Sequence, residues 1–461
     1  MSEHAHSLNS ATSGLSALPG TAKPFAATRA MSRFLKNGDI PFHALIEPAQ
    51  DAVRDLLTFS PSRFVLLVTD WCMFGFNSHK GKPDRCQRSH KTDLGYDLGS
   101  VIAVDANDGR PLGPMEFRLR TANGILSTRI RHTSCPPGHL DEVLEAMEES
   151  RRWNLKPTPI HIIDREADSV GHYRQWAARG HKFLVRADVD RLVTWRGKET
   201  HLTKVLEGIS CDFQDVLNER GEPEIVTLRQ GTGRVRVAET AVILHRPAKH
   251  FVHIEEEAKQ EEPAKREATA EAPPLEMGTD ETPQKEKRKA TKKQVEIPGP
   301  PIPLRLVVTR VVDEVGKVHA EWLLFTNVEV ECADAGVIGK WYAWRWVIET
   351  FHKLLKSAGQ NAEEWQQDSG EAFLRRLMVA SMSCLTVWHL QKEEGEEAAR
   401  LRKILVRLSG RQMKHKVEST APALLAGLEK LLAIDDLLEG EDLAEVLALA
   451  RKVLPQLFRS G

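Results

Sequence analysis

Tyr342, Arg345, Glu349, Lys353 and Lys356 recur at intervals of three, four, four and three residues in a segment that is otherwise largely apolar. Such intervals place side chains on one face of an α-helix. This face would carry a single acid among three bases and a phenol. A carboxylate can bind a metal ion, and basic and hydroxyl side chains donate hydrogen bonds to phosphate oxygens. The face is therefore a candidate for chemistry on phosphate esters.

The same face has a simpler interpretation as a solvent-exposed ladder of ion pairs. Arg–Glu and Glu–Lys pairs at this spacing stabilise a helix by only about 0.2–0.5 kcal/mol each. An adjoining apolar stripe should pack against the core under either interpretation. The stripe consists of Trp341, Trp344, Ile348, Phe351 and Leu355. Further acids are needed to favour one interpretation over the other.

Two such acids stand at the ends of short apolar segments. Asp70 closes the segment FVLLVTD, and Asp164 closes PIHIID. Phosphoryl transfer by a two-metal mechanism requires a small set of carboxylates that hold two Mg²⁺ ions about 4 Å apart. Mg²⁺ prefers oxygen ligands and keeps several waters, so few protein carboxylates suffice. With Glu349 the two aspartates would complete such a set, although an acid at a strand end is also common for reasons of turn geometry.

The sequence pattern around these acids predicts an α/β fold with a mixed sheet. Short turn-like loops join the first three predicted strands, as in an antiparallel meander, whereas helices separate the later strands. Alternation of strands and helices favours parallel pairing. The predicted strands are 64–70, 100–106, 115–121, 159–164 and 182–186, and an amphipathic helix is predicted over 141–153.

The regions that flank these strands differ from them in composition and in predicted secondary structure. Residues 190–250 and 303–328 are strand-rich, and the segment between them is rich in Glu, Lys, Pro and Ala, acidic first and basic later. We expect this segment, 255–300, to be a disordered linker. Its basic end, KEKRKATKK, is either a solvated stretch or a DNA contact. The pattern is helical from Val337 onward.

The bulk composition is that of a globular protein and does not indicate a class of ligand. The chain has 461 residues, of which 41% are hydrophobic and 28% charged, and its net charge is −1. Basic side chains would therefore have to be arranged locally if they bind a nucleic acid. The 6 cysteines form no CxxC pair, and the spacing of Cys72, Cys86 and His90 fits no common zinc module.

Neither a signal peptide nor a membrane span is predicted. The N-terminus lacks an apolar segment of the kind that signal peptides carry. The most apolar helical stretch, near 377–390, is shorter than the roughly 20 residues that a bilayer requires. We therefore expect a cytoplasmic protein with no membrane partner.

The charged residues resemble the signature of a known family. Bacterial cut-and-paste DDE transposases of insertion-sequence family four carry a Y-R-E-K signature, in which two, three and six residues separate the four positions. The residues that match it at every position are Tyr342, Arg345, Glu349 and Lys356. The run at 164–168 resembles the family's D-R-E-A-D run, whose first Asp is the second catalytic acid. Asp70 stands where the first catalytic acid of the family lies.

The resemblance covers roughly residues 60 to 395 and implies a ribonuclease H-like fold. It also implies that Asp70, Asp164 and Glu349 are catalytic and hold Mg²⁺, for which Mn²⁺ can substitute. The bases and the phenol of the Y-R-E-K helix would contact DNA, and Lys353 aligns with a further phosphate-contacting base.

Two more residues align with DNA contacts of the family. Trp322, in AEWLLFT, aligns with a strand tryptophan that stacks on a base flipped out at the transposon end. Such stacking is worth roughly 1–3 kcal/mol, and the alternative is a core tryptophan. Arg186, in FLVRAD, matches an arginine that contacts DNA near the active site, and the alternative is an ordinary surface arginine.

The predicted architecture is thus a ribonuclease H-like α/β core, a mixed sheet with helices on both faces, with a β-rich insertion and a C-terminal helical region. The core would comprise 59–189 and 337–395, and the insertion, with its linker 255–300, would comprise 190–336. A disordered N-terminus (1–25) and a small helical, candidate DNA-binding module (26–58) precede the core. Helices at 396–461, with Leu424, Leu428, Leu431 and Leu432 among their apolar positions, serve either dimerisation or core packing.

We therefore expect a DNA transposase that catalyses cut-and-paste transposition of an insertion sequence. The expected partners are double-stranded DNA, as terminal inverted repeats and as target, and a second copy of the chain in the synaptic complex. The bacterial protein would associate with the nucleoid when bound to DNA. The alternatives are a catalytically inactive, domesticated DNA-binding protein and a related nuclease that cuts without strand transfer.

Overall fold

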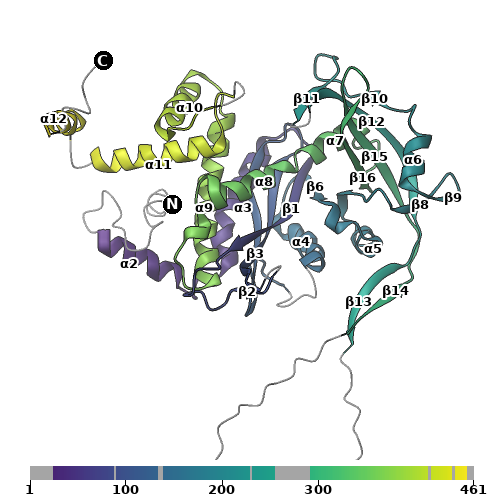
Figure 1. The fold of residues 1–461 in the computed structure, drawn as a ribbon, viewed down its shortest axis with the longest axis horizontal. Coiled ribbons are helices and arrows are strands. Elements are labelled where there is room, and N and C mark those ends of the chain that lie inside the picture. Colours follow the sequence, from purple (N-terminus) through teal and green to yellow (C-terminus); the bar gives the residue numbers. More distant parts are fainter. Residues whose placement is uncertain are drawn as a thin grey trace, which may run out of the picture.

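The computed structural model describes residues 24–87, 90–132, 139–228, 231–254, 291–413, 417–438 and 442–453. Nearly all of the N-terminal segment expected to be disordered lies outside these residues, as does 255–290 of the expected linker. The described chain is an α/β protein in which helices cover both faces of a long mixed sheet (Figure 1). The predicted α/β class with a mixed sheet is confirmed.

Five strands carry the part of the sheet that contains the predicted acids. They are β1 (Phe64–Gly75), β3 (Leu94–Asp105), β4 (Pro111–Thr121), β6 (Thr158–Ile163) and β7 (Lys182–Arg186). Their order is β4-β3-β1-β6-β7. β1, β3 and β4 pair antiparallel, whereas β6 is parallel to both β1 and β7. The meander followed by parallel strands agrees with the sequence prediction, but β1 continues past Asp70 to Gly75, so Asp70 lies within the strand and not at its end. Two short strands complete this part, β2 (Cys86–Gln87) beside β3 and β5 (Gly124–Ser127) beside β4.

The β-rich insertion continues the same sheet. β16 pairs antiparallel with β7, and β15, β12, β8 and β9 follow in that order, with β10 and β11 also paired to β12. The strands are β8 (Leu192–Trp195), β9 (Lys198–His201), β10 (Gln214–Asp215), β11 (Ile225–Leu228), β12 (Gly231–Leu244), β15 (Ile302–Val312) and β16 (Val318–Thr326), and helix α6 (Leu202–Gly208) packs beside them. The insertion is therefore an extension of the core sheet.

A separate two-stranded ribbon projects from this extension (Figure 1). It pairs β13 (Ala248–Ile254) with β14 (Thr291–Ile297). β14 falls within the 255–300 segment that the sequence assigned to a linker. Local composition could not reveal it, because the pairing partner of β14 lies about forty residues earlier in the chain.

Helices cover both faces because side chains alternate along each strand. On β1, Leu66 and Val68 point into one core cluster, and Val65 and Leu67 point into another. Helices α7, α8 and α9 cover the face of Leu66 and Val68, which we call the α8 face. Helices α4 and α5 contribute to the clusters of the opposite face. The bounds are α4 (Glu142–Ser150), α5 (Val170–Ala178), α7 (Ala335–Ala343), α8 (Trp346–Lys353) and α9 (Gly370–Lys392). Single turns of other helix types are η2 (His139–Asp141), η3 (Arg151–Trp153), η4 (Arg165–Ala167), η5 (Leu354–Ala358) and η6 (Ala362–Glu364).

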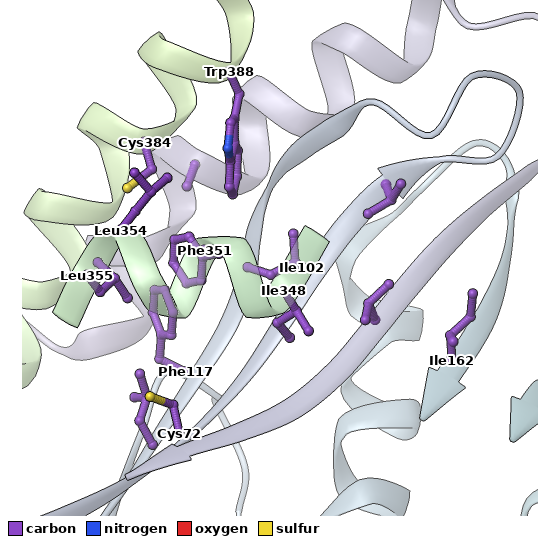
Figure 2. Packing of buried hydrophobic residues seen from close by; sticks show 14 of the residues in the cluster. Cys72, Ile102, Phe117, Ile162, Ile348, Phe351, Leu354, Leu355, Cys384 and Trp388 are labelled. Carbon is purple, nitrogen blue, oxygen red and sulfur yellow. The ribbon is translucent and has the colours of Figure 1, made fainter. Parts of the chain in front are cut away.

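Aromatic packing sets the position of α8 over the sheet. Ile348 and Phe351 point from α8 toward Ile102 of β3 and Phe117 of β4 (Figure 2). The rings of Phe351 and Phe117 are stacked with their centroids 6.1 Å apart, and Trp388 of α9 lies 5.6 Å from Phe351. Four of the five residues of the predicted apolar stripe are buried, along α7, α8 and η5, and Trp344 is half-buried; the burial of Ile348 and Phe351 fixes which side of α8 faces the sheet.

The N-terminal helices are joined to the core. Helix α3 (Phe42–Phe59) buries Val53 and Leu57 among residues of β1, β3 and β4. Helix α2 (Pro24–Leu35) packs through Met31 and Leu35 against Ala372 of α9. The two helical patterns predicted within 26–58 are thus present, and α3 is part of the main core.

The C-terminal region consists of α10 (Glu396–Ser409), α11 (Ala421–Leu438) and α12 (Leu443–Val453). Leu424 is buried in the main cluster, and Leu428 and Leu431 pack against it. Core packing therefore accounts for three of the four leucines considered for dimerisation, and Leu432 is half-buried. The homodimer stays a prediction. Among the residues described, no helix combines the length and the apolar character needed to cross a membrane.

We expect Leu57→Ala to lower the free energy of unfolding by about 2–4 kcal/mol, because it leaves a cavity between α3 and the sheet. Leu57 is 2% exposed, whereas Phe59, on the same helix, is 86% exposed and provides the control. Phe59→Ala should change stability by less than about 0.5 kcal/mol. Denaturant unfolding measures both values, and equal values would show that α3 is not packed on the sheet.

Candidate active site

The segment predicted as one helix over 341–358 is divided into three parts. Helix α7 ends at Ala343, α8 begins at Trp346, and η5 is a π-helical turn. At the junction Arg345 N–H donates to Tyr342 O at 3.0 Å, and Ile348 N–H donates to Arg345 O at 3.1 Å. These i to i+3 bonds replace the i to i+4 bonds of an α-helix. Residues three or four apart are neighbours in either geometry, so the sequence spacing could not reveal the break.

Strand register places the two aspartates side by side. Val68 of β1 lies opposite Ile162 of β6, and Asp70 and Asp164 each follow two residues later. Asp164 in turn comes directly after Ile163, which is paired with Val185 of β7, and Arg186 comes directly after Val185. Asp70, Asp164 and Arg186 therefore continue one row across three strands. Strand alternation sends all three side chains to the α8 face, because Val68 and Ile162 already point there.

Arg345 joins Asp70 to Glu349. Its Nη1 lies 2.9 Å from Asp70 Oδ2, and its Nη2 lies 2.5 Å from Glu349 Oε1. The side chains of Arg345, Asp70 and Glu349 are 10%, 18% and 37% exposed, so the ion pairs are open to solvent mainly on the side of Glu349. The structure thus brings the first and third predicted acids together through a shared guanidinium.

The environment of Asp70 opposes its charge. Burial raises the pKa of Asp70 to about 6 despite the lowering effects of the Trp71 backbone N–H and of Arg345. The carboxylates of Asp164 and Glu349 also raise this pKa, so both lie close enough to Asp70 to act on its charge. Perturbation by burial together with specific charged neighbours is typical of functional sites.

Asp164 is presented by the turn that follows β6. Its side chain caps η4, accepting a hydrogen bond from Glu166 N–H at 2.9 Å. The last acid of the D-R-E-A-D run, Asp168, holds this turn in place. Its carboxylate accepts hydrogen bonds from Tyr173 OH at 2.9 Å and from Asp188 N–H at 2.8 Å, and it pairs with Arg191 at 2.9 Å. Asp168 thereby ties the loop after β6 to the loop after β7.

The remaining residues of the predicted helix face differ in their surroundings. Tyr342 is 4% exposed, and burial raises the pKa of its phenol. Lys353 is exposed. Lys356 donates to Met73 O at 2.7 Å and pairs with Glu363 at 3.2 Å. Only part of the predicted polar face therefore reaches solvent, so the simple picture of a solvent-exposed ladder does not describe it.

Arg186 and Trp322 lie near this region on the same face of the sheet. Arg186 is half-buried at the end of β7, opposite Leu324 of β16, and its charge acts on Tyr342. Trp322 lies two residues before Leu324 and packs against the core cluster of the α8 face. It remains partly exposed, so it combines core packing with an accessible ring.

Sequence reasoning gave no role to Trp346 or Glu363. Trp346 is 55% exposed, and its ring lies 5.5 Å from the guanidinium of Arg345. Its signal in the sequence is a tryptophan outside the apolar stripe. Glu363 accepts a hydrogen bond from Gly75 N–H at 2.8 Å and pairs with Lys356, holding the end of β1. Nothing in local spacing indicates that contact, which joins residues 288 positions apart.

The donor set suits a hard divalent cation, since two adjacent strands and one helix each direct a carboxylate to the α8 face. Arg345 nevertheless occupies one oxygen of Asp70 and one oxygen of Glu349. In the described part of the chain, no three His, Cys, Asp or Glu side chains converge as a ready metal cluster. The residue types therefore fit Mg²⁺, and Arg345 would have to move for the carboxylates to close on an ion.

No protein-family model matches the chain, and comparison with curated proteins gives no match. Among solved structures, the chain is similar to the piggyBac transposase in a cryo-EM structure of its synaptic complex with hairpin DNA, with a TM-score of 0.32 and 10% sequence identity. The similarity covers 87% of this chain, which spans 58% of that one. A likeness of this degree does not by itself identify a fold or an activity.

We expect Asp168→Ala to lower the free energy of unfolding by about 3 kcal/mol, because it leaves Arg191 without its buried partner. The Asp168 side chain is 3% exposed. Asp190→Ala, which removes an exposed acid from the neighbouring loop, should change stability by less than about 0.5 kcal/mol. Urea denaturation of both variants tests this, and a cost for Asp168→Ala no larger than that of the control would contradict a role in holding the two loops.

Proposed function

We propose that the chain is a DDE transposase that cuts and joins DNA, of the kind found in insertion-sequence family four. The observation that carries the proposal is the row of Asp70 and Asp164 on adjacent parallel strands, with Glu349 linked to Asp70 by Arg345. We also propose that the core is ribonuclease H-like. The strand order β4-β3-β1-β6-β7, in which a three-stranded meander is followed by two strands parallel to the first, supports this assignment.

Asp70, Asp164 and Glu349 would hold Mg²⁺ or Mn²⁺. When bound there, divalent cations supply charge stabilisation to the reacting phosphate and make an attacking oxygen more nucleophilic. The chain's own contribution would be to hold the three carboxylates near one another, and the register of β1 with β6 and the packing of α8 support this role. Pre-organised charge of this kind accounts for most of the catalysis in phosphoryl transfer.

The proposed reaction follows the resemblance of the sequence to its family. A water oxygen bonds to phosphorus at the element's end, and the 3′-oxygen leaves. The freed 3′-hydroxyl attacks the opposite strand, which releases flanking DNA and closes a hairpin. A second water opens the hairpin, and the 3′-hydroxyl then attacks a phosphate of the target.

Basic residues around the carboxylates would hold the DNA. Lys353 is exposed one turn after Glu349, and Arg186 ends the row beside Asp164. Lys356 and Arg345 would reach phosphate after exchanging their present partners, and the buried Tyr342 would support Arg345. Trp322, which is partly exposed, would stack on an unpaired base.

A supercoiled plasmid carrying the element's ends tests the activity, with Mg²⁺ and purified protein. Asp164→Asn and Glu349→Gln should each lower cleavage on the order of 10³-fold, because the loss of a metal ligand removes several kcal/mol of charge stabilisation. Asp190→Asn, at an exposed acid outside the site, should cleave like the unaltered protein. Hairpinned excision products would support transposition.

Other outcomes of the plasmid experiment distinguish the alternatives. Nicked plasmid alone would indicate a nuclease without strand transfer. A shifted but uncut plasmid would indicate a domesticated DNA-binding protein. Cleavage that is unchanged in Asp164→Asn and Glu349→Gln would show that the active site has been assigned to the wrong acids.

Lys353→Ala tests the phosphate contacts. Loss of one phosphate contact should reduce the slope of log affinity against log salt concentration by about 0.9 for duplex DNA. Fluorescence anisotropy over a series of salt concentrations measures this slope. Lys403→Ala, at an exposed lysine of α10 in the C-terminal region, is the control and should leave it unchanged. An unchanged slope for Lys353→Ala would remove Lys353 from the interface.

A further inference from the structure

The guanidinium of Arg345 occupies one oxygen of each of two carboxylates that would bind a divalent cation. Nη1 takes Asp70 Oδ2 at 2.9 Å, and Nη2 takes Glu349 Oε1 at 2.5 Å. A cation held by the same two carboxylates would lie close to the guanidinium, and two positive charges repel each other at such separations. The two therefore compete for one site.

The surroundings hold Arg345 in this position. Its guanidinium lies 5.9 Å from the ring of Tyr342 and 5.5 Å from the ring of Trp346, so aromatic faces flank it. Arg345 as a whole is 8% exposed. The packing of the Tyr342 and Trp346 rings against the guanidinium shows that the bridge is built into the junction of α7 and α8.

Nε of Arg345 is buried and makes no hydrogen bond to either carboxylate, and the guanidinium also interacts with the Tyr342 hydroxyl. A phosphate offers several charged acceptor oxygens in a geometry that suits the fork of arginine donors. An arriving phosphate could therefore replace both carboxylates as the partner of Arg345.

We propose that Arg345 is an internal counter-ion of the carboxylates in the DNA-free protein, and that a DNA phosphate draws it away so that a divalent cation can enter. This inference rests on the proposed function. Arg345 then couples two binding events: metal binds weakly until DNA is present. Reciprocity requires that metal tightens DNA binding by the same factor. The protein would therefore bind its metal ions mainly after a DNA end has bound.

Mn²⁺ binding to the DNA-free protein tests the proposal, with free Mn²⁺ measured by electron paramagnetic resonance. Arg345→Gln, which removes the charge, should bind Mn²⁺ at least 10-fold more tightly than the unaltered protein. It should also show a Mn²⁺-dependent rise in melting temperature, because a ligand that binds the folded state stabilises it. Arg165→Gln removes an exposed charge next to Asp164 and is the control; its Mn²⁺ affinity should change far less.

Two further variants keep the test decisive. Asp70→Asn added to Arg345→Gln should abolish the gain, and a gain that survives would place the metal elsewhere and overturn the proposal. If Arg345→Gln shows no cooperative unfolding, Arg345→Lys replaces it, since a lysine keeps the charge but cannot bridge both carboxylates. It should also bind Mn²⁺ more tightly than the unaltered protein. Equal affinity of the unaltered protein and these variants would overturn the proposal.

This experiment uses no DNA cleavage, so it fails independently of the proposed function. If cleavage depends on Asp164 and Glu349 but the Mn²⁺ affinity is the same with and without Arg345, only the counter-ion role is overturned. Tighter Mn²⁺ binding by Arg345→Gln, together with no DNA cleavage by the unaltered protein, would instead support the counter-ion role and overturn the proposed transposase activity.

Discussion

The pairing of β1 with β3 on one side and β6 on the other is the constraint on which the candidate site depends. Once Val68 lies opposite Ile162, the two-residue period of a strand leaves no choice in the direction of Asp70 and Asp164. A shift of one residue in either strand would bury an aspartate on the opposite face, where Val65 and Leu67 pack. The alternation that fills both cores therefore also gathers the acids.

Gathering acids beneath a helix has an electrostatic cost, and the break between α7 and α8 provides the means of offsetting it. Burial raises the pKa of Asp70 to about 6, so the charged form needs a positive neighbour. Arg345 lies in the tight turn between the helices, from which it reaches Asp70 on the sheet and Glu349 one turn later. Packing of Phe351 against Phe117 and Trp388 fixes the position of α8 over the sheet, so that Arg345 can contact both Asp70 and Glu349.

Contacts beyond the acids stabilise the same arrangement. Asp168 ties together the loops that follow β6 and β7, which carry Asp164 and adjoin Arg186. Lys356 and Glu363 hold the end of β1 just beyond Asp70. The extension of the sheet through β16 brings Trp322 to the α8 face as well. Several distant parts of the chain thus support a small region at the carboxyl ends of β6 and β7 and beside the middle of β1.

By itself, the sequence determined the α/β class, the meander followed by parallel strands, and most of the apolar stripe that runs from α7 to η5, because these follow from the local periodicity of apolar residues. Spacing and resemblance also indicated Asp70, Asp164 and Glu349 as candidate acids. Only the tertiary structure decided that Arg345 bridges Asp70 and Glu349, that Tyr342 is buried, and that the insertion extends the core sheet. Arg345 and Asp70 are 275 positions apart in the chain, and local spacing carries no information about which charged group a side chain meets across such a separation.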